Sequence, residues 1–254
     1  MIPAKAPRQP ARLWPRLARG GLMGLCLWLS GAGTGLAQSW QAEHLVTADY
    51  AEPTDRYPHG VLGDTIEYGA LTLHYSAGPA ITIRLPQTRV FEDIAPRIVD
   101  VDGDQKPEAL VIESHANEGA RLAIYNGDGL MAATPYIGTR FRWLAPIGTG
   151  DLDGDGHVEI AYIDRPHLAK RLRIWRFKDG ALQQIADKDG LTNHRIGEDF
   201  ISGGLRTCAG QPELLTANAN WSRIMASTFD GHSITSRDLG PFDKTRLNAA
   251  LNCE

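Results

Sequence analysis

Two acidic segments of the chain have the residue types and the spacing of a metal-binding loop. They span residues 100–108 and 151–159, and each has Asp at positions 1, 3 and 5 and Glu at position 9. When such a loop wraps, the Asp carboxylates point inward, and the carbonyl at position 7 and the Glu carboxylate can join them. All of these ligands are hard oxygens, which suit Ca²⁺ because it takes about six to eight oxygen ligands. A divalent cation also relieves the repulsion among the clustered carboxylates.

We therefore expect two calcium sites with a structural role. The candidate ligands are Asp100, Asp102, Asp104, the Lys106 carbonyl and Glu108 in the first loop, and Asp151, Asp153, Asp155, the His157 carbonyl and Glu159 in the second. Zn²⁺ is disfavoured because neither loop has Cys or His at a side-chain ligand position, and Mg²⁺ suits an all-protein cage less well. The alternative is a pair of solvated Asx-type turns. The second loop is the more complete, because Gly156 stands where the first loop has Gln105.

A repeat of about fifty residues organises the rest of the chain. Glu108, Glu159 and Glu213 each open a short apolar strand, at separations of 51 and 54 residues. Ahead of each lies an apolar run that ends in a loop, and after each come a second strand, a tight Gly turn and a weaker fourth strand. The pattern predicts one four-stranded antiparallel meander for each unit.

Such meanders are typical of β-propeller blades. We expect an all-β propeller of about four blades, forming a single domain over residues 38–254. The expected units are about residues 44–90, 91–140, 141–195 and 196–242. The segments 39–50 and 243–254 are candidates for a closing segment or a partial fifth blade. The alternative is an ordinary β-sandwich whose strand spacing is coincidental.

The motif Asp-x-Asp-Gly-Asp-Gly-x-x-Glu ahead of a strand, repeated in β-blades, resembles the FG-GAP or VCBS repeat family. This family occurs in integrin α-subunit propellers and in many secreted bacterial proteins. The resemblance extends from Arg56 to Phe242 for the blades, but only two units carry the motif. It implies a propeller with calcium held in inter-strand loops by the ligands named above. The fourth unit keeps Glu213 but its loop, residues 203–212, has no Asp, and the first unit also lacks the ligand set, so neither is expected to bind calcium.

The first 37 residues have the organisation of a secretory signal. They contain five basic residues and no acid, then an apolar stretch from Gly20 to Gly35, and small residues at Gly35 and Ala37 for cleavage before Gln38. A membrane anchor is the alternative, but the apolar run is shorter than the roughly 20 residues needed to cross a bilayer. We expect export to the periplasm or the extracellular space, with no membrane insertion after cleavage.

Charge and cysteine content narrow the range of partners. The chain has 26 Lys and Arg against 30 Asp and Glu, and removal of the signal segment leaves a formal charge of about −9. No basic stripe is available to neutralise phosphates, which excludes nucleic acid and an anionic membrane surface as expected partners. Cys208 and Cys253 are the cysteines outside the signal segment, and in an exported chain we expect them to form a disulfide rather than two reactive thiols.

One further segment has residues that could act in catalysis. Residues 55–67 contain Arg56, His59, Asp64 and Glu67, and a hydrolase acting on a saccharide or ester could use them for proton transfer beside a small pocket. The alternative is that Arg56 pairs with Asp64 and orders the loop. Because neither a triad nor a metal-ligand His spacing is visible, we assign no catalytic residue. The expected function is a non-enzymatic binding or scaffold module whose partner is an extracellular or periplasmic protein or carbohydrate.

Overall fold

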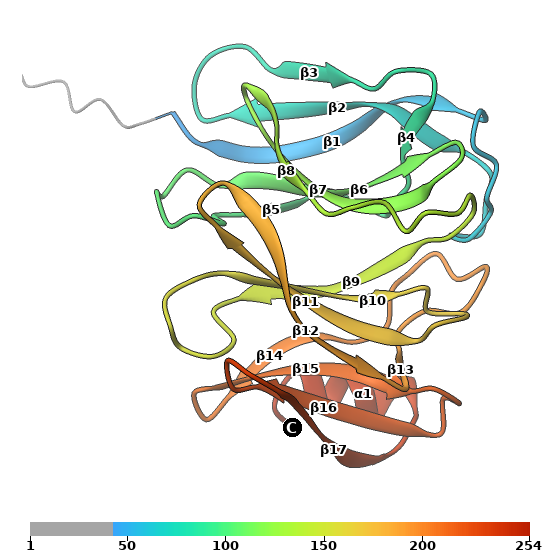
Figure 1. The fold of residues 1–254 in the computed structure, drawn as a ribbon, viewed down its shortest axis with the longest axis vertical. Helices are drawn as coiled ribbons and strands as arrows, with labels where there is room; N and C mark the ends of the chain where they lie inside the picture. Colours follow the sequence, from blue (N-terminus) through green and yellow to red (C-terminus); the bar gives the residue numbers. More distant parts are fainter. Residues whose placement is uncertain (1–42) are drawn as a thin grey trace, which may run out of the picture. The chain divides into compact units, whose positions relative to one another are not determined.

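The computed structural model describes residues 43–254, which fold mainly into antiparallel strands that follow one another along the chain (Figure 1). The expected signal sequence over residues 1–37, with Gln38 after it, lies outside these residues. The all-β expectation is confirmed. Within the described residues, no helix is long and apolar enough to cross a membrane.

The first eight strands form one sheet. They are β1 (Leu45–Thr54), β2 (Glu67–Tyr75), β3 (Ile81–Arg84), β4 (Arg89–Phe91), β5 (Arg97–Val99), β6 (Glu108–His115), β7 (Gly119–Asn126) and β8 (Gly129–Ala133). Their order is β1-β2-β4-β6-β7-β8, with β3 paired to β2 and β5 paired to β6. The short strand β4 pairs with both β2 and β6, so it joins the first two groups of strands into a continuous hydrogen-bonded sheet.

Two further sheets follow. The second contains β9 (Leu144–Gly150), β10 (Glu159–Asp164), β11 (Arg171–Lys178) and β12 (Ala181–Asp189) as a simple meander. The third contains β13 (Leu191–Thr192), β14 (Gly204–Cys208), β15 (Gln211–Asn218), β16 (Arg223–Phe229) and β17 (Ile234–Pro241), and it is followed by the helix α1 (Lys244–Leu251). The third sheet and α1 occupy the lower part of Figure 1.

The central strands are apolar on both faces because other strands cover both faces. In β6, Leu110 and Ile112 belong to a core shared with β10, while Val111 belongs to a core shared with β2. In β10, Ile160 faces the first of these cores and Ile163 faces the core shared with the third sheet. Burial on both faces explains why these strands are continuous apolar runs in the sequence rather than alternating patterns.

The structure corrects the expected strand positions in the fourth unit. The segment 203–212, expected as a loop, forms a hairpin in which β14 runs from Gly204 and pairs with β15. Residues 200–202, the apolar run ahead of this segment, form no strand. The turn at Ala209 and Gly210 has positive φ at both residues, 53° and 82°. Two such residues match the twist of a tight hairpin.

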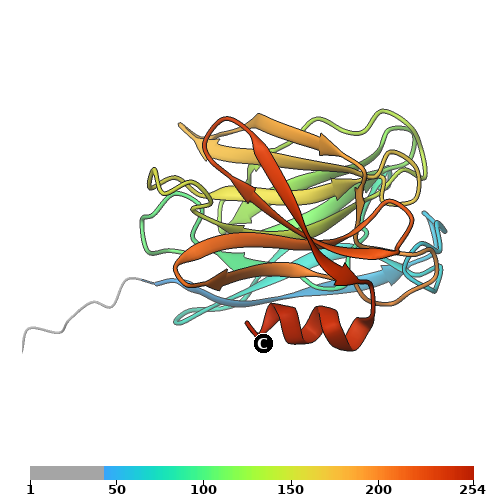
Figure 2. The same ribbon diagram turned by 90° about the horizontal axis from the view of Figure 1, so that it is seen from below.

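The C-terminal segment also differs from expectation, because residues 244–251 are a helix and supply no strand of a further blade. Asp243 caps this helix by accepting hydrogen bonds from the amides of Thr245 and Arg246. Leu247 is buried against Leu215 and Ile224, so α1 covers one face of the third sheet (Figure 2). The expected disulfide is confirmed: Cys208 and Cys253 are bonded, and they fasten the second residue after α1 to the end of β14. A disulfide is typical of proteins outside the cytoplasm.

Candidate metal sites

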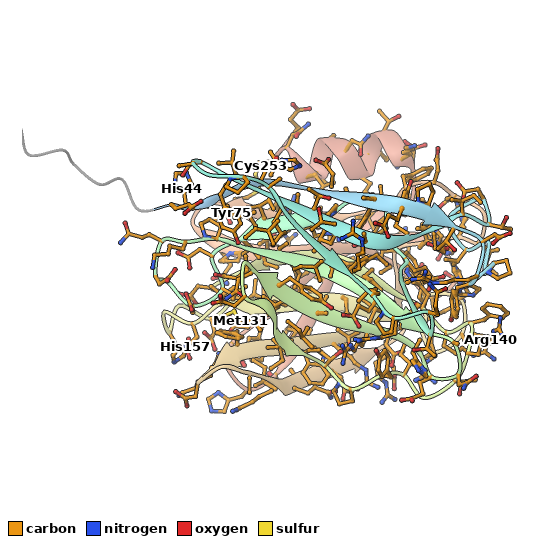
Figure 3. The ribbon with its side chains drawn as sticks, turned by 90° about the horizontal axis from the view of Figure 1, so that it is seen from above. His44, Tyr75, Met131, Arg140, His157 and Cys253 are labelled. Carbon is orange, nitrogen blue, oxygen red and sulfur yellow. A yellow bond between two sulfur atoms is a disulfide. The ribbon has the colours of Figure 1, made fainter. Side chains whose placement is uncertain are left out.

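The two acidic loops are equivalent corners of successive strand groups. The first lies between β5 and β6, and the second between β9 and β10. In each loop three acids, at positions 1, 3 and 9, have carboxylate oxygens within 4.8 Å of one another: Asp100, Asp102 and Glu108 in the first, and Asp151, Asp153 and Glu159 in the second. These two acidic triads could hold metal ions, because converging carboxylate oxygens suit a hard cation. Figure 3 shows Met131, beside the first loop, and His157, in the second, toward the same end of the strands.

Backbone amides orient the acids in the same way in both loops. The Asp at position 1 accepts from the amides at positions 4 and 6, at 2.7 and 3.0 Å in each loop. The Glu at position 9 accepts from the amide at position 2, at 3.1 Å for Glu108 and 2.8 Å for Glu159. The loop geometry therefore preorganises the triads through the protein's own hydrogen bonds.

The Asp at position 5 stands outside each triad. Asp104 accepts from the amide of Lys106 at 2.7 Å, and Asp155 accepts from the amide of His157 at 2.9 Å. The Lys106 ammonium lies 3.7 Å from Asp104, at the margin of an ion pair. Thus all ten predicted residues lie in the two loops, and the structure brings the side chains of six of them into the triads.

Gln105 occupies a backbone conformation that favours glycine. Its φ is 68°, while Gly156 at the same position of the second loop has a φ of 86°. A left-handed residue with a Cβ costs about 1–2 kcal/mol. The first loop therefore adopts the same backbone conformation as the second at some cost in stability. Judged by backbone conformation alone, this supports the expectation that the second loop is the more complete.

Arg176 changes that ranking, because its guanidinium already lies among the acids of the second loop. It contacts Asp153 at 2.6 Å, Asp155 at 2.7 Å and Glu159 at 2.6 Å. Only 16% of the Arg176 side chain is exposed, and Glu159 is fully buried. The second loop thus contains a cation of its own, and a metal ion there would have to share or displace these contacts.

Strand pairing explains why the first loop lacks such a cation. Glu159 pairs with Arg176 in the β10–β11 register. In the β6–β7 register Ala109 pairs with Tyr125, which places Asn126 opposite Glu108. A cavity of about 460 Å³ opens beside this loop, and its lining includes Asp102, Glu108 and Asn126. The first triad therefore has both the uncompensated charge and the room that a hydrated cation requires, so it fits Ca²⁺ better than the second.

Burial and charge act together on the two Glu residues. Burial, together with the neighbouring Asp102, Asp100 and Asp104, raises the pKa of Glu108 to about 7, against the lowering effect of the hydrogen bond from the Val101 amide. Burial also raises the pKa of Glu159, but Arg176 is among the groups that oppose the rise. Arg176 therefore reduces the repulsion among the carboxylates of the second loop, whereas this repulsion persists in the first loop.

The corner at Glu213 uses arginines alone. Arg206 and Arg237 donate to its carboxylate at 2.5 and 2.6 Å. Burial works against ionisation of Glu213, but these hydrogen bonds outweigh it and hold its pKa below the usual value. The three corner Glu residues thus differ in their charged neighbours. Glu108 has Asp residues only, Glu159 has Asp residues and one arginine, and Glu213 has two arginines.

The residues of the 55–67 segment have separate partners. Arg56 donates to the carbonyl of Arg89 at 3.0 Å, so it does not pair with Asp64, whose carboxylate accepts from the amide of Ile66. His59 Nδ1 lies 2.5 Å from a carboxylate oxygen of Glu92, a buried acid that the sequence did not single out. Glu67 is buried, and this burial, with Glu92, Asp64 and Asp93 nearby, raises its pKa to about 9.

Together these features define an all-β repeat protein with acidic corner loops. Residues 100–162 match the FG-GAP-like repeat family, a span that includes both acidic loops. The chain therefore contains an FG-GAP-like repeat, as the resemblance of its motifs implied. No curated protein matches the chain.

Proposed function

We propose that this chain is an exported calcium-binding repeat protein whose strand groups are blades of the propeller type. Calcium has a structural role in it, and the protein acts as a non-enzymatic binding or scaffold module. The observation that carries the proposal is the convergence of Asp100, Asp102 and Glu108 beside an open cavity. The disulfide and the signal-like N-terminal segment support export. The proposed partner is an extracellular or periplasmic protein or carbohydrate.

The contacts of the first loop support calcium rather than an empty turn. Its carboxylates are held together by the loop amides, yet within residues 43–254 their one ion pair is that of Asp104 with Lys106, at 3.7 Å. Clustered charges that lack a counter-ion repel one another, and a bound divalent ion converts that repulsion into attraction. Oxygen ligands of this kind suit Ca²⁺.

A hydrolase with His59, Asp64 and Glu67 as its proton-transfer groups is the second candidate. A cavity beside His59 favours it. However, Asp64 is exposed and hydrogen-bonded to its own loop, and Glu67 is buried. Because these contacts do not bring the three side chains together at one site where they could act on a substrate, we prefer the non-enzymatic function.

The calcium proposal is tested on the purified protein after metal removal with a chelator. We expect Ca²⁺ to raise the melting temperature and chelator to reverse the rise, because a ligand of the native state stabilises it by about 2.7 kcal/mol at one hundred times its Kd. Titration calorimetry measures the affinity, with Mg²⁺ and Zn²⁺ as competing ions.

Two matched variants locate the site. Asp102→Asn and Asp153→Asn change the same position of the two loops. We expect Asp102→Asn to weaken calcium binding strongly and Asp153→Asn to weaken it less, because Arg176 lies in the second loop. If the wild-type melting temperature is the same in Ca²⁺ and in chelator, the calcium proposal is wrong.

A further inference from the structure

A second cavity lies at the other end of the strands from the acidic loops. It has a volume of about 390 Å³, and its lining includes His59, Phe141, Arg142, Trp143, Arg165 and His167. Figure 3 marks this end by Arg140, whose guanidinium lies 4.4 Å from the centre of the Phe141 ring. The volume falls within the range of about 300–1,000 Å³ that is usual for small-molecule sites.

The charge of this cavity is positive, although the chain as a whole is acidic. In residues 43–254, Arg142 has no carboxylate within ion-pair distance, and it donates only to the carbonyl of Phe141. Arg165 shares Asp164 with Arg173, so one carboxylate balances two guanidinium groups. No acid is among the residues that line the cavity. Two positive charges therefore remain unbalanced at its wall.

The other ionisable groups do not cancel these charges. His59 contacts Glu92, but Glu92 does not line the cavity, and burial raises its pKa, which disfavours its charged form. Burial, with His194 nearby, lowers the pKa of His167 to about 4, so its ring is neutral at pH 7. Glu67, which interacts electrostatically with Glu92, is protonated at pH 7, because burial and the neighbouring acids raise its pKa to about 9.

Apolar side chains form the remainder of the wall. Leu168 and Ile196 line this cavity, and they are the most exposed large apolar side chains of the described residues, at 62% and 72%. Large apolar side chains that border a polar pocket favour a ligand with an apolar body. The Trp143 indole, which also lines the cavity, is fixed in place by a hydrogen bond to the carbonyl of Glu92.

The wall is held rigidly, partly at the expense of backbone strain. Phe141 and Arg165 have φ values of 57° and 47°, which non-glycine residues rarely adopt, and both line the cavity. Strained backbone of this kind is concentrated at functional sites. The Phe141 ring also stacks on the His59 ring, with 5.0 Å between their centres. Behind His59, Glu92 accepts a hydrogen bond from the Ser114 hydroxyl.

From this combination of charge, apolar wall and rigidity, we infer that the cavity binds a small organic anion, in which an oxyanion group contacts Arg142 and Arg165 and an apolar body packs on Leu168 and Ile196. Arginine suits this role because its planar guanidinium can donate two parallel hydrogen bonds to a carboxylate or phosphate. The inference is independent of calcium, since the acidic loops lie at the opposite end.

The test uses benzoate and phenyl phosphate as anionic probes, with benzyl alcohol and benzylamine as neutral and cationic probes of similar size. Binding to the purified, calcium-loaded protein is measured by ligand-observed NMR and by Trp fluorescence. We expect at least one anionic probe to bind and benzylamine not to bind, and the binding to weaken as salt is added.

Two variants assign the binding to the cavity. Arg142→Gln is expected to weaken binding of the anionic probe roughly tenfold or more, because hydrogen bonds to a charged group are lost. Arg84→Gln removes an exposed arginine in β3 and should leave binding unchanged. Circular dichroism and the calcium-dependent melting shift check that both variants fold.

Three results would overturn the inference. They are the failure of both anionic probes to bind, equal binding of benzyl alcohol and the better anion, and unchanged binding in a folded Arg142→Gln variant. In each case the calcium response, measured separately, shows whether the proposed function still holds.

Discussion

Glu108 and Glu159 have the same position in the same acidic motif but different neighbours in space. The residue opposite Glu159 is Arg176, 17 positions further along the chain, and the residue opposite Glu108 is Asn126. A single side chain thus decides whether an acidic corner carries its own cation. This difference predicts that the two loops respond differently to calcium.

Exchanging these two residues should exchange the metal responses. In Arg176→Asn, three acids lose their guanidinium partner. We expect this variant to be less stable than wild type in chelator, because breaking such a partly buried pair costs up to a few kcal/mol. Calcium should restore most of the loss by binding at the second loop. In Asn126→Arg, the new guanidinium should reduce calcium binding at the first loop.

Calorimetric titration of both variants, with chelator-treated protein, measures the number and affinity of the sites. Arg171→Asn is the control, because it removes an exposed arginine from the same strand. The explanation fails if Arg176→Asn gains neither affinity nor sites for Ca²⁺ relative to wild type.

The spacing of Asp and Glu was sufficient to predict the loops, but Arg176 could not be identified in the same way. The loop ligands are local in sequence, so position within nine residues determines which side chains converge. The role of Arg176 depends on the β10–β11 register, which a pattern of apolar residues sets only approximately. The connection between β10 and β11, residues 165–170, was the available signal, because counting outward from it pairs Arg176 with Glu159.

Among the strands and the helix, the elements that are buried on both faces were the easiest to predict from the sequence. The strands β6 and β10 are covered on both faces, so their apolar runs were visible in the sequence. In contrast, β14 is short and half-exposed, and α1 has a single buried residue, Leu247. Such elements depend on a cap, a turn or a neighbouring strand. The periodic spacing of apolar residues in the sequence does not indicate any of these features.

The disulfide compensates for the small apolar contact of α1. Replacing both cysteines, Cys208→Ser with Cys253→Ser, should lower the free energy of unfolding by about 2–4 kcal/mol, because the bond closes a loop of 45 residues. Hydrogen exchange should accelerate first in α1, which lies between the two cysteines in sequence and next to β14. Urea denaturation with and without reductant measures the loss.

The double variant itself provides the control, because reductant should not affect its stability. If fully reduced wild type, verified by thiol titration, unfolds at the same urea concentration as the oxidised protein, the disulfide has no stabilising role.

For the whole molecule, the two candidate sites lie at opposite ends of the strands. The acidic loops lie at one end, and the cavity with unbalanced arginines lies at the other. The buried acid Glu92 contacts His59 of that cavity, and the buried acid Glu67 interacts electrostatically with Glu92. Burial raises the pKa of both, which makes the stability of the whole fold sensitive to pH.

Glu67 determines the direction of this sensitivity. Its pKa is raised from 4.5 in the unfolded chain to about 9 in the folded protein, so between these values the folded state keeps a proton that the unfolded state has lost. The contribution of Glu67 is therefore fully present below about pH 4.5 and is lost as the pH rises toward 9. The slope is at most about 1.4 kcal/mol per pH unit.

Glu67→Gln should remove this slope, because glutamine stays neutral at every pH. The variant should gain stability relative to wild type as the pH is raised from 5 to 9, when both are compared by urea denaturation in saturating Ca²⁺. Glu118→Gln, at an exposed position, is the matched control and should run parallel to wild type. Parallel profiles for Glu67→Gln and wild type would show instead that Glu67 is already ionised in the folded protein, and that a counter-charge or water reaches it.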